Sequence, residues 1–337
     1  MSLDRNVPPE FAAQTLSQFA IVSMKPMVGG LSGARVWRCH SNLHGPLCLR
    51  QWPSTHPTQP RLQFIHHALD QANKQLSFIP KLFRDSDGKS FWAVGECLWE
   101  ITQWMPGQAD YMRQPSREKL AAAVNTLAEV HRVWHDLSHA QDVSPSVAQR
   151  IEMLSEWLAM RNLVEQIGAV LRGPVESAAC MSTVRMLHAR GPQLLDELQV
   201  ASAVKVTLHP VLRDIWSDHV LFHGELVSGI IDFGTVRMDE PAADLARMLG
   251  SLHPFEEDVR LGAIEAYNRQ RPLHEVVPER VELLDRSGTL LTALQWMQWL
   301  VLERRKFNVE AAPLLERWQT ALSRMMGESL LIGTGPC

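Results

Sequence analysis

Two aspartates, Asp214 and Asp232, flank a short segment whose residue pattern predicts a β-hairpin. Residues 220–222 and 226–231 are apolar runs suited to strands, and the pair 223–224 suits the turn between them. The hairpin therefore brings both carboxylates to one edge of a small sheet. Mg²⁺ prefers carboxylate oxygens, and a positioned carboxylate can accept the proton of a hydroxyl nucleophile. The pair indicates chemistry on a metal-bound phosphate.

A glycine-rich stretch near the amino terminus is a second candidate for phosphate binding. Gly29, Gly30 and Gly33, with Ser32 among them, would let backbone N–H groups approach phosphate oxygens without obstruction by a Cβ atom. An ordinary hairpin turn uses the same residue types, so the stretch alone does not establish a site. The P-loop pattern is absent, which disfavours a P-loop nucleotide fold.

The elements that must position these residues change character along the chain. The first hundred residues are mostly strand with one helix, and the remainder is mostly helix interrupted by the hairpin, which predicts an α+β protein. Expected strands cover 20–28, 34–40, 47–52, 91–94 and 99–104, and expected helices cover 62–76, 116–135, 147–171, 175–187, 256–269 and 279–306. We place the domain boundary after residue 104, giving domains of residues 1–104 and 105–337.

The order and spacing of the motifs resemble the catalytic core of the aminoglycoside phosphotransferase and choline kinase-like family. That family has a loop H-G-D, four further residues and Asn, then an apolar triplet, a hairpin and I-D-F/W. Here 212–214 occupies the start of the loop, His219 the Asn position and 231–234 the second Asp motif. The family's D-P-x-x-D-L-A element is matched by E-P-A-A-D-L-A at 240–246. The resemblance implies a protein-kinase-like fold with a small β-rich lobe and a larger, mainly helical lobe.

The resemblance also implies roles for the loop residues. Asp214, with Arg213 beside it, would be catalytic and would orient the acceptor hydroxyl, and Asp232 would ligate Mg²⁺ between the β- and γ-phosphates. The plainer alternative is that Arg213 and Asp214 cap a loop and that Asp232 forms a turn after the strand. Asp244 is expected to steady the catalytic loop or a helix start.

Nucleotide contacts follow from the same resemblance. Gly29, Gly30, Ser32 and Gly33 would lie over the phosphates, and Ile101 and Gln103 would belong to the hinge that holds the adenine edge through its backbone. Arg50 occupies the position of the family's phosphate-binding lysine, and this swap changes the geometry of the cation. The partner glutamate is absent between Pro53 and Arg84, and Gln63 is the best match for its position. The ion pair has been either lost or rebuilt.

His219 is the most informative departure from the family pattern. An imidazole nitrogen is a poorer ligand for Mg²⁺ than the usual Asn oxygen. His219 would therefore ligate a softer ion such as Mn²⁺, bind phosphate, or leave metal binding to Asp218. A histidine merely packed beside the hairpin is an equal alternative. Leu212 replaces a polar histidine in the same loop. Because of these departures, a catalytically inactive member of the family is an alternative.

Composition excludes several classes of protein. The chain has 337 residues, 45% hydrophobic and 21% charged, with a net charge of −4 and scattered basic residues, so neither nucleic acid nor an anionic membrane is an expected partner. No apolar run approaches the length of a membrane span, and no secretory signal is evident. The five cysteines lack a C-x-x-C spacing, which favours a reduced cytoplasmic protein. A monomer and a homodimer are equally compatible.

The function predicted from these features is transfer of the γ-phosphoryl group of ATP or GTP to a hydroxyl of a small molecule, with Mg²⁺ or Mn²⁺ as the metal ion. The alternative is a catalytically inactive kinase-like protein that binds a nucleotide or another ligand. The identity of the acceptor is not encoded in the shared core, because different helical insertions serve different acceptors.

Overall fold

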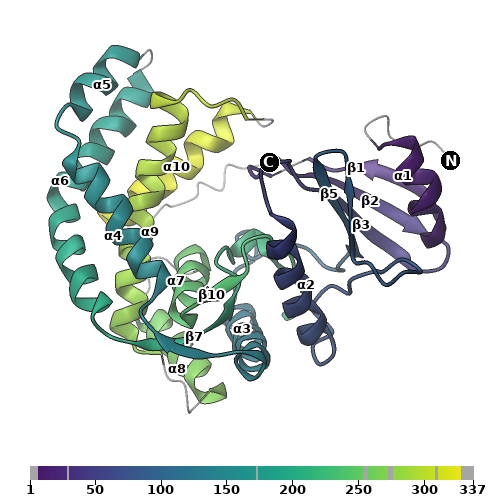
Figure 1. The fold of residues 1–337 in the computed structure, drawn as a ribbon. Coiled ribbons are helices and arrows are strands. Elements are labelled where there is room, and N and C mark those ends of the chain that lie inside the picture. The colour runs from purple at the N-terminus through teal and green to yellow at the C-terminus, as the bar shows by residue number, and fades with distance from the viewer. Residues whose placement is uncertain are drawn as a thin grey trace. The chain divides into compact units, whose positions relative to one another are not determined.

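The computed structural model describes residues 7–28, 30–171, 174–252, 257–271, 276–307 and 310–327. It divides into two compact units, the first formed by Met1–Leu137 with Ser217–Arg237 and the second by Ser138–Trp216 with Met238–Cys337 (Figure 1). This division differs from the expected boundary after residue 104, because the hairpin of residues 220–230 and the helix that follows the strands pack with the β-rich part. The predicted α+β class is confirmed.

The first unit is built on a five-stranded sheet with neighbouring strands antiparallel. In spatial order its strands are β1 (Ile21–Pro26), β2 (Arg35–Ser41), β3 (Gly45–Gln51), β5 (Cys97–Gln103) and β4 (Phe91–Val94). The predicted strands agree with these to within two residues at either end. Side chains alternate along β3, so Leu47 and Leu49 are buried on one face while Cys48 and Arg50 project from the other.

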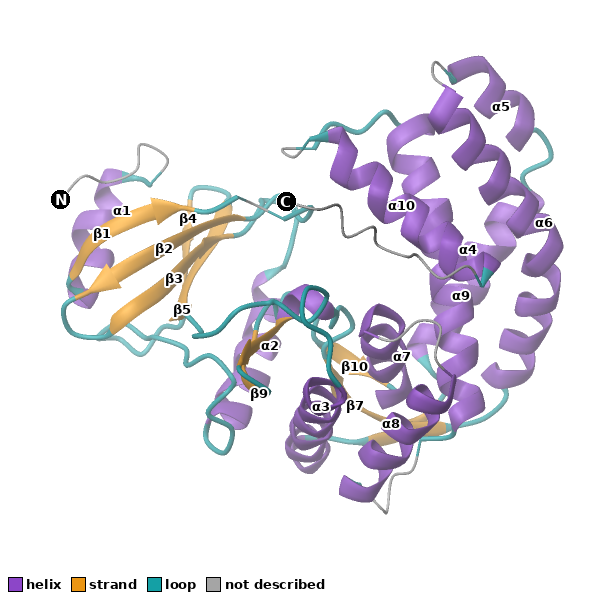
Figure 2. Cartoon of the chain, turned by 180° about the vertical axis from the view of Figure 1, so that it is seen from behind, coloured by secondary structure: helices purple, strands orange, loops and turns teal. Residues whose placement is uncertain are grey.

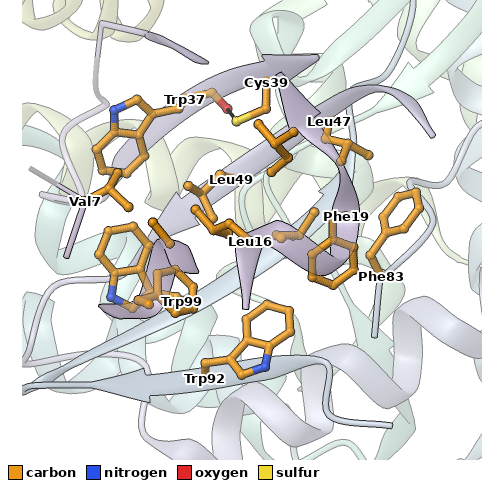
Figure 3. Close-up of a cluster of buried hydrophobic side chains, with 14 residues drawn as sticks. Val7, Leu16, Phe19, Trp37, Cys39, Leu47, Leu49, Phe83, Trp92 and Trp99 are labelled. Atoms are coloured by element: carbon orange, nitrogen blue, oxygen red, sulfur yellow. Dashed lines mark hydrogen bonds between the residues drawn. The ribbon is translucent and has the colours of Figure 1, made fainter. Parts of the chain in front are cut away.

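The buried face of this sheet is covered by α1 (Pro9–Gln14) and the 3₁₀ turn η1 (Leu16–Phe19). Figure 3 shows the resulting cluster, in which Trp37 and Trp99 stack with ring centroids 5.5 Å apart. Phe11 of α1 lies 5.0 Å from the Trp99 ring. The sequence pattern did not predict α1. Because apolar packing occupies this face, the polar side chains of β3 and β5 gather on the opposite one.

Two helices and the hairpin complete the first unit. They are α2 (Gln59–Asn73), α3 (Arg117–Leu137), β8 (Val220–His223) and β9 (Leu226–Ile230). The indole of Trp134 on α3 donates a hydrogen bond to the Ala68 carbonyl on α2 at 2.9 Å, and α3 also packs on β9. The predicted hairpin is confirmed, with Gly224 at its turn in the left-handed region.

The hairpin is fastened to the segment that follows β5. Gln108 and Phe222 exchange backbone hydrogen bonds of 3.0 and 2.8 Å. Gly107 and Gly229 allow this close approach, since a Cβ on Gly107 would meet the Phe222 carbonyl oxygen at 2.7 Å and one on Gly229 would meet the Met105 Cβ at 2.7 Å. These contacts explain why the hairpin groups with the β-rich part of the chain.

The second unit is mainly helical, and α4, α6, α9 and α10 run side by side in it (Figures 1 and 2). Its helices are α4 (Pro145–Ala159), α5 (Leu163–Val170), α6 (Pro174–Ser202), α7 (Pro241–Leu252), α8 (Glu257–Gln270), α9 (Pro278–Met297), a π-helical turn (Gln298–Leu302) and α10 (Ala311–Met326). A small sheet of order β10-β7-β6 uses β10 (Arg237–Asp239), β7 (Val206–Val211) and β6 (Ala140–Asp142). None of the described helices is long and apolar enough to cross a membrane.

Three predicted helices have different limits in the structure. The helix expected over 147–171 is two helices, because Met160 ends α4 in an extended conformation. The helix expected over 175–187 continues to Ser202, past Pro192, with Gly191 packed closely against Leu158 of α4. The helix expected over 279–306 ends at Met297 and gives way to the π-helical turn. The helix α10 and the strands β6, β7 and β10 were not predicted.

Candidate active site

Arg50 is the centre of an ionic network in the first unit. Its Nη1 donates to Asp232 Oδ1 at 3.1 Å, and its Nε lies 3.7 Å from Glu100 Oε1. Burial lowers the pKa of the Arg50 guanidinium, but the negative charges of Asp232 and Glu100 have the larger effect and raise it above its ordinary value. The Nε atom is buried and makes no hydrogen bond within the described residues. Arg50 therefore remains cationic, and 16% of its side chain is exposed.

Glu100 lies opposite Arg50 in the pairing of β3 with β5 and is held by a histidine from α2. His66 contacts Glu100 Oε2 through Nε2 at 2.7 Å and Ser90 Oγ through Nδ1 at 2.8 Å. Burial would raise the pKa of Glu100, but His66 and Arg50 lower it below its ordinary value. The buried carboxylate is thus kept ionised beside the cation.

The side chain that pairs with Arg50 differs from the one expected from the family pattern. Gln63, the expected match for the partner glutamate, is exposed on α2. The carboxylate comes instead from Glu100 on β5, and α2 supplies His66 to hold it. Of the two alternatives for this ion pair, the described residues therefore favour rebuilding over loss.

Asp232 combines an unusual backbone with a half-exposed carboxylate. Its φ of 64° lies in the left-handed region, and 43% of its side chain is exposed. Partial burial would raise its pKa, but Arg50 and His219 lower it. The motif glycine that follows, Gly234, packs on Trp52, whose ring a Cβ would meet at 2.7 Å. The Asp232 carboxylate is therefore ionised, and the backbone around it constrains its direction.

His219 lies beside Asp232, with its Nε2 3.7 Å from Asp232 Oδ2. The position predicted from the family loop is therefore occupied by an imidazole next to the carboxylate, whereas Asp218 is exposed. Within the described part of the chain, no cluster of three His, Cys, Asp or Glu side chains suits a metal ion. A divalent ion at Asp232 would depend on further oxygens from a nucleotide or water, as Mg²⁺ sites in phosphotransferases do. The donor set fits such a shared site.

The glycine-rich stretch forms the turn between β1 and β2. Ser32 Oγ accepts the Ala34 N–H at 3.3 Å, and Gly33 has a φ of 78°. Gly30 is exposed, and a Cβ there would meet no atom within 4 Å. Gly29 lies outside the described residues. The described part of the turn leaves its backbone accessible to a ligand.

Ile101 and Gln103 do not present a free hinge backbone. Ile101 is fully buried in β5, and its carbonyl accepts the Phe83 N–H at 3.0 Å. The Gln103 N–H donates to the Lys81 carbonyl at 2.8 Å. Because these groups are used within the protein, the structure does not support recognition of adenine by the Ile101 carbonyl or the Gln103 amide.

Asp214 in the second unit is paired with an arginine from α7. Arg247 donates to Asp214 Oδ1 through Nη2 at 3.1 Å and Nε at 3.3 Å. About two fifths of each side chain is exposed, at 40% for Arg247 and 42% for Asp214. The Arg247 guanidinium also lies 5.8 Å from the ring centroid of Trp216. Asp214 is therefore accessible and has a cation beside it.

The loop that carries Asp214 is anchored by Asp244 at the start of α7. Its two carboxylate oxygens accept the N–H groups of Leu212 and Arg213, both at 2.6 Å. This contact confirms the expected supporting role of Asp244. Burial raises the pKa of Asp244 to about 7, although the two N–H donors and the Arg213 cation lower it in part.

The side chain of Arg213 lies in a buried polar cluster. Its guanidinium bonds Asp239, which is fully buried, and also Ser146 Oγ and Gln149 Oε1, both at 2.7 Å. Only 13% of the side chain is exposed, and its backbone adopts a φ of 72°. The expected catalytic role of Arg213 is thereby corrected: its contacts make it an anchor of the loop.

Sequence reasoning missed Glu100, His66, Asp239 and Arg247. His66 lies four residues after Leu62, on the buried face of the predicted helix, where a polar side chain signals a buried partner. Glu100 stands alone among apolar residues of a strand, which is a similar signal. Arg247 lies on the surface, where a single arginine carries no such signal.

The chain is similar in sequence to a known enzyme family and to two homoserine kinases. A model of the phosphotransferase enzyme family matches residues 23–284. The homoserine kinase of Nitrobacter winogradskyi is 30% identical over 217 residues, which cover 63% of this chain and 60% of that protein. The homoserine kinase of Nitrobacter hamburgensis is 29% identical over 184 residues, covering 53% of this chain and 50% of that protein. The matched region thus spans less than two thirds of these relatives.

Solved structures resemble the whole chain at low sequence identity. Spectinomycin phosphotransferase in complex with ADP and spectinomycin aligns with a TM-score of 0.62 and 12% identity over 91% of this chain and 93% of that one. Amicoumacin kinase in complex with AMP-PNP and Ca²⁺ aligns with a TM-score of 0.61 and 9% identity over 95% and 94%. These likenesses establish the expected protein-kinase-like fold.

Proposed function

Because the chain belongs to the phosphotransferase enzyme family, we propose that it transfers the γ-phosphoryl group of ATP or GTP to a hydroxyl of a small molecule. The observation that carries the proposal is the contact of Asp232 with Arg50, which sets a carboxylate for a metal beside a cation for phosphate. Phosphoryl transfer depends mainly on positioning and charge neutralisation, and these two groups supply both.

The first unit would hold the nucleotide phosphates. Arg50 would donate from its guanidinium to a phosphate oxygen, and the backbone of Gly30, Ser32 and Gly33 would approach the phosphates from the turn. Asp232 would ligate Mg²⁺, or Mn²⁺ where His219 shares the ion. A bound divalent ion supplies neutralisation of the charge that develops on the β- and γ-phosphate oxygens. The paired charges keep Asp232 and Arg50 ionised for these tasks.

Asp214 would orient the acceptor hydroxyl and accept its proton. Its carboxylate is accessible, and Asp244 fixes the backbone of the loop before it. Arg247 donates to Oδ1 of Asp214 and would help to hold the carboxylate in place for the hydroxyl. Arg213 supports this role from the buried cluster around Asp239 without touching the acceptor.

Similar proteins support a small alcohol as the acceptor. The sequence relatives are named homoserine kinases, and the structural neighbours are named for spectinomycin and amicoumacin. The name of each relative describes that relative alone, and the shared feature of these acceptors is a hydroxyl on a small molecule. We therefore propose this class and no single acceptor.

A catalytically inactive nucleotide-binding protein is the second candidate. The observations that favour it are His219 in place of the family's Asn and Leu212 in place of its His. The contact of Arg50 with Glu100 argues against an inactive protein, because a site that has lost its activity would not be expected to keep a buried carboxylate beside its cation. Acceptor-dependent turnover separates the two candidates.

The test begins with thermal unfolding of the full chain in the presence of ATP or GTP, each with Mg²⁺ or Mn²⁺. Binding to the folded state alone raises stability by about 2.7 kcal/mol at a hundred times the dissociation constant. We expect a metal-dependent rise in Tm that Asp232→Asn abolishes and that the exposed control Asp87→Asn retains. Absence of any nucleotide effect would sink both candidates.

Turnover is then measured as ADP or GDP release over a panel of small alcohols. Acceptor-dependent release that falls at least about a hundredfold in Asp214→Asn supports the transferase. Nucleotide binding without release for any alcohol favours the inactive protein.

A further inference from the structure

A pocket of about 250 Å³ lies in the first unit, where β3 begins and β5 ends. We infer that this pocket, here called the edge pocket, binds a small aromatic anion, which phosphoryl transfer itself does not require. Its lining comes from the turn between β2 and β3, from the start of β3, from the segment before β4 and from the end of β5. The lining residues are His44, Pro46, Lys81, Phe83, Gln103 and Trp104.

The edge pocket is separate from the network around Arg50. Gln103 pairs with Leu47, whose side chain lies on the buried face of β3, opposite Arg50. Because paired residues of neighbouring strands share a face, the Gln103 side chain lies on that side too. Phe83 belongs to the same face, edge-on to Phe19 with ring centroids 6.4 Å apart (Figure 3). A ligand in the edge pocket would therefore leave the Arg50 side of the sheet open.

Hydrogen bonds to the backbone fix the segments that carry the polar groups of the edge pocket. Ser41 Oγ accepts the His44 N–H at 2.9 Å in the turn between β2 and β3. The Lys81 carbonyl accepts the Gln103 N–H at 2.8 Å, which holds the segment before β4 beside β5. A pocket whose walls are fixed in this way loses little further conformational freedom when a ligand binds.

Two nitrogen-bearing side chains converge on the ring of Phe83. The Lys81 ammonium lies 5.5 Å from the centroid of that ring, and the centroid of the His44 imidazole lies 4.9 Å from it. Within the described part of the chain, neither side chain forms a hydrogen bond or an ion pair, and the Gln103 amide forms none either. No carboxylate lines the pocket. The ammonium and the N–H groups therefore favour an anionic ligand.

The remaining walls of the edge pocket favour a flat, apolar ligand body. Phe83, Trp104 and Pro46 provide them, and the two aromatic rings offer surfaces on which a further ring can pack. The volume lies just below the range of about 300–1,000 Å³ that is usual for small-molecule pockets. It suits a single ring system with a short acidic group. A cationic aromatic molecule would meet the Lys81 ammonium and is disfavoured.

The experiment is titration calorimetry of the full chain without nucleotide. The probes are the aromatic anions benzoate, indole-3-acetate and phenyl phosphate, their neutral counterparts benzamide, indole-3-acetamide and phenol, and inorganic phosphate. The proteins are the wild type, Lys81→Gln, Trp104→Leu and Lys205→Gln. Lys205 is an exposed lysine of the second unit, so its variant is the matched control for Lys81→Gln.

We expect at least one aromatic anion to bind with a Kd of about 1 mM or below and about tenfold more tightly than its neutral counterpart. Lys81→Gln should weaken binding of that anion about tenfold and leave binding of the neutral probe unchanged, because it removes the charge alone. Lys81 is exposed, so this variant should keep the fold. Trp104→Leu should weaken both probes, since ring packing does not depend on charge. Lys205→Gln should bind as the wild type does.

Equal affinity for anionic and neutral probes, or anion binding that survives Lys81→Gln, overturns the inference. Binding of inorganic phosphate in preference to every aromatic anion also overturns it, because the rings then contribute nothing. Absence of binding by all three aromatic anions up to about 10 mM has the same meaning. These titrations need neither nucleotide nor turnover, so their outcome is independent of the proposed function.

Discussion

Arg50 and Asp232 are joined by a guanidinium–carboxylate contact of 3.1 Å although 182 residues separate them in the chain. The contact links the third strand of the sheet to the loop that leaves the hairpin, both within the first unit. Glu100 lies on the other side of the cation, so one arginine is shared by a buried and a half-exposed carboxylate. This sharing ties the conformation of the Asp232 loop to the sheet.

Substitution of Arg50 tests the network directly. Arg50→Gln leaves Glu100 with His66 alone and removes the Asp232 partner, so we expect a loss of about 3 kcal/mol in the free energy of unfolding and at least a tenfold rise in the Kd of the nucleotide. Arg50→Lys should recover part of both, since it restores the charge. Urea unfolding and nucleotide titration of the three proteins measure the effects. Nucleotide binding by Arg50→Gln at wild-type affinity would show that Arg50 does not hold phosphate.

His66 is predicted to act through Glu100 on the same network. His66→Leu removes a 2.7 Å partner from a buried carboxylate, which should cost about 2 kcal/mol of stability. The neighbouring His67 is exposed on the same helix, so His67→Leu is the matched control and should change stability by less than about 0.5 kcal/mol. Urea midpoints measure both. Equal losses in the two variants would contradict the assigned role.

The sequence predicted those features that depend on local pattern. The five strands of the first sheet, the hairpin and its turn, and the place of His219 beside Asp232 follow from alternation, turn residues and motif spacing. Asp244 could be assigned a supporting role because its motif has a known place before the helix. The order of these elements was sufficient to indicate the fold.

The missed features depend on contacts between distant segments. Whether Arg50 pairs with Gln63 or with Glu100 is decided by strand pairing, which no local pattern reports. The continuation of α6 past Pro192 likewise depends on packing against α4, which outweighs the local preference to end a helix. The role of Arg213 was misjudged because its partner Asp239 belongs to a strand that the pattern did not predict.

The pH dependence of the free energy of unfolding should show the titration of Asp244. Its pKa is about 7 in the folded chain against an ordinary 3.8, so between these values the folded protein holds a proton that the unfolded chain has released. The contribution of Asp244 is therefore complete below about pH 4 and is lost as the pH rises towards 7. Asp244→Asn does not titrate, so the stability difference between wild type and variant should shrink as the pH rises through this window.

Urea unfolding of both proteins at several pH values between 4 and 8 measures that difference. The variant comparison is necessary because Glu100 and Asp232 act in the opposite direction. Their lowered pKa values contribute stability that is present above their ordinary pKa and is lost as the pH falls through the folded value. A stability difference that stays constant from pH 4 to 8 would mean that Asp244 does not titrate in this range.

The contact between the hairpin and the segment after β5 predicts a large effect of one methyl group. Gly107 has a φ of 100°, and a Cβ there would clash with Ser228 Oγ and meet the Phe222 carbonyl oxygen at 2.7 Å. Gly107→Ala should therefore lower the free energy of unfolding by more than about 2 kcal/mol, through backbone strain and displacement of the hairpin. Gly224 has a φ of 60° and open space around it, so Gly224→Ala should cost only about 1 kcal/mol. Urea unfolding compares the two, and a cost for Gly107→Ala no greater than that for Gly224→Ala would refute the close packing of the hairpin on this segment.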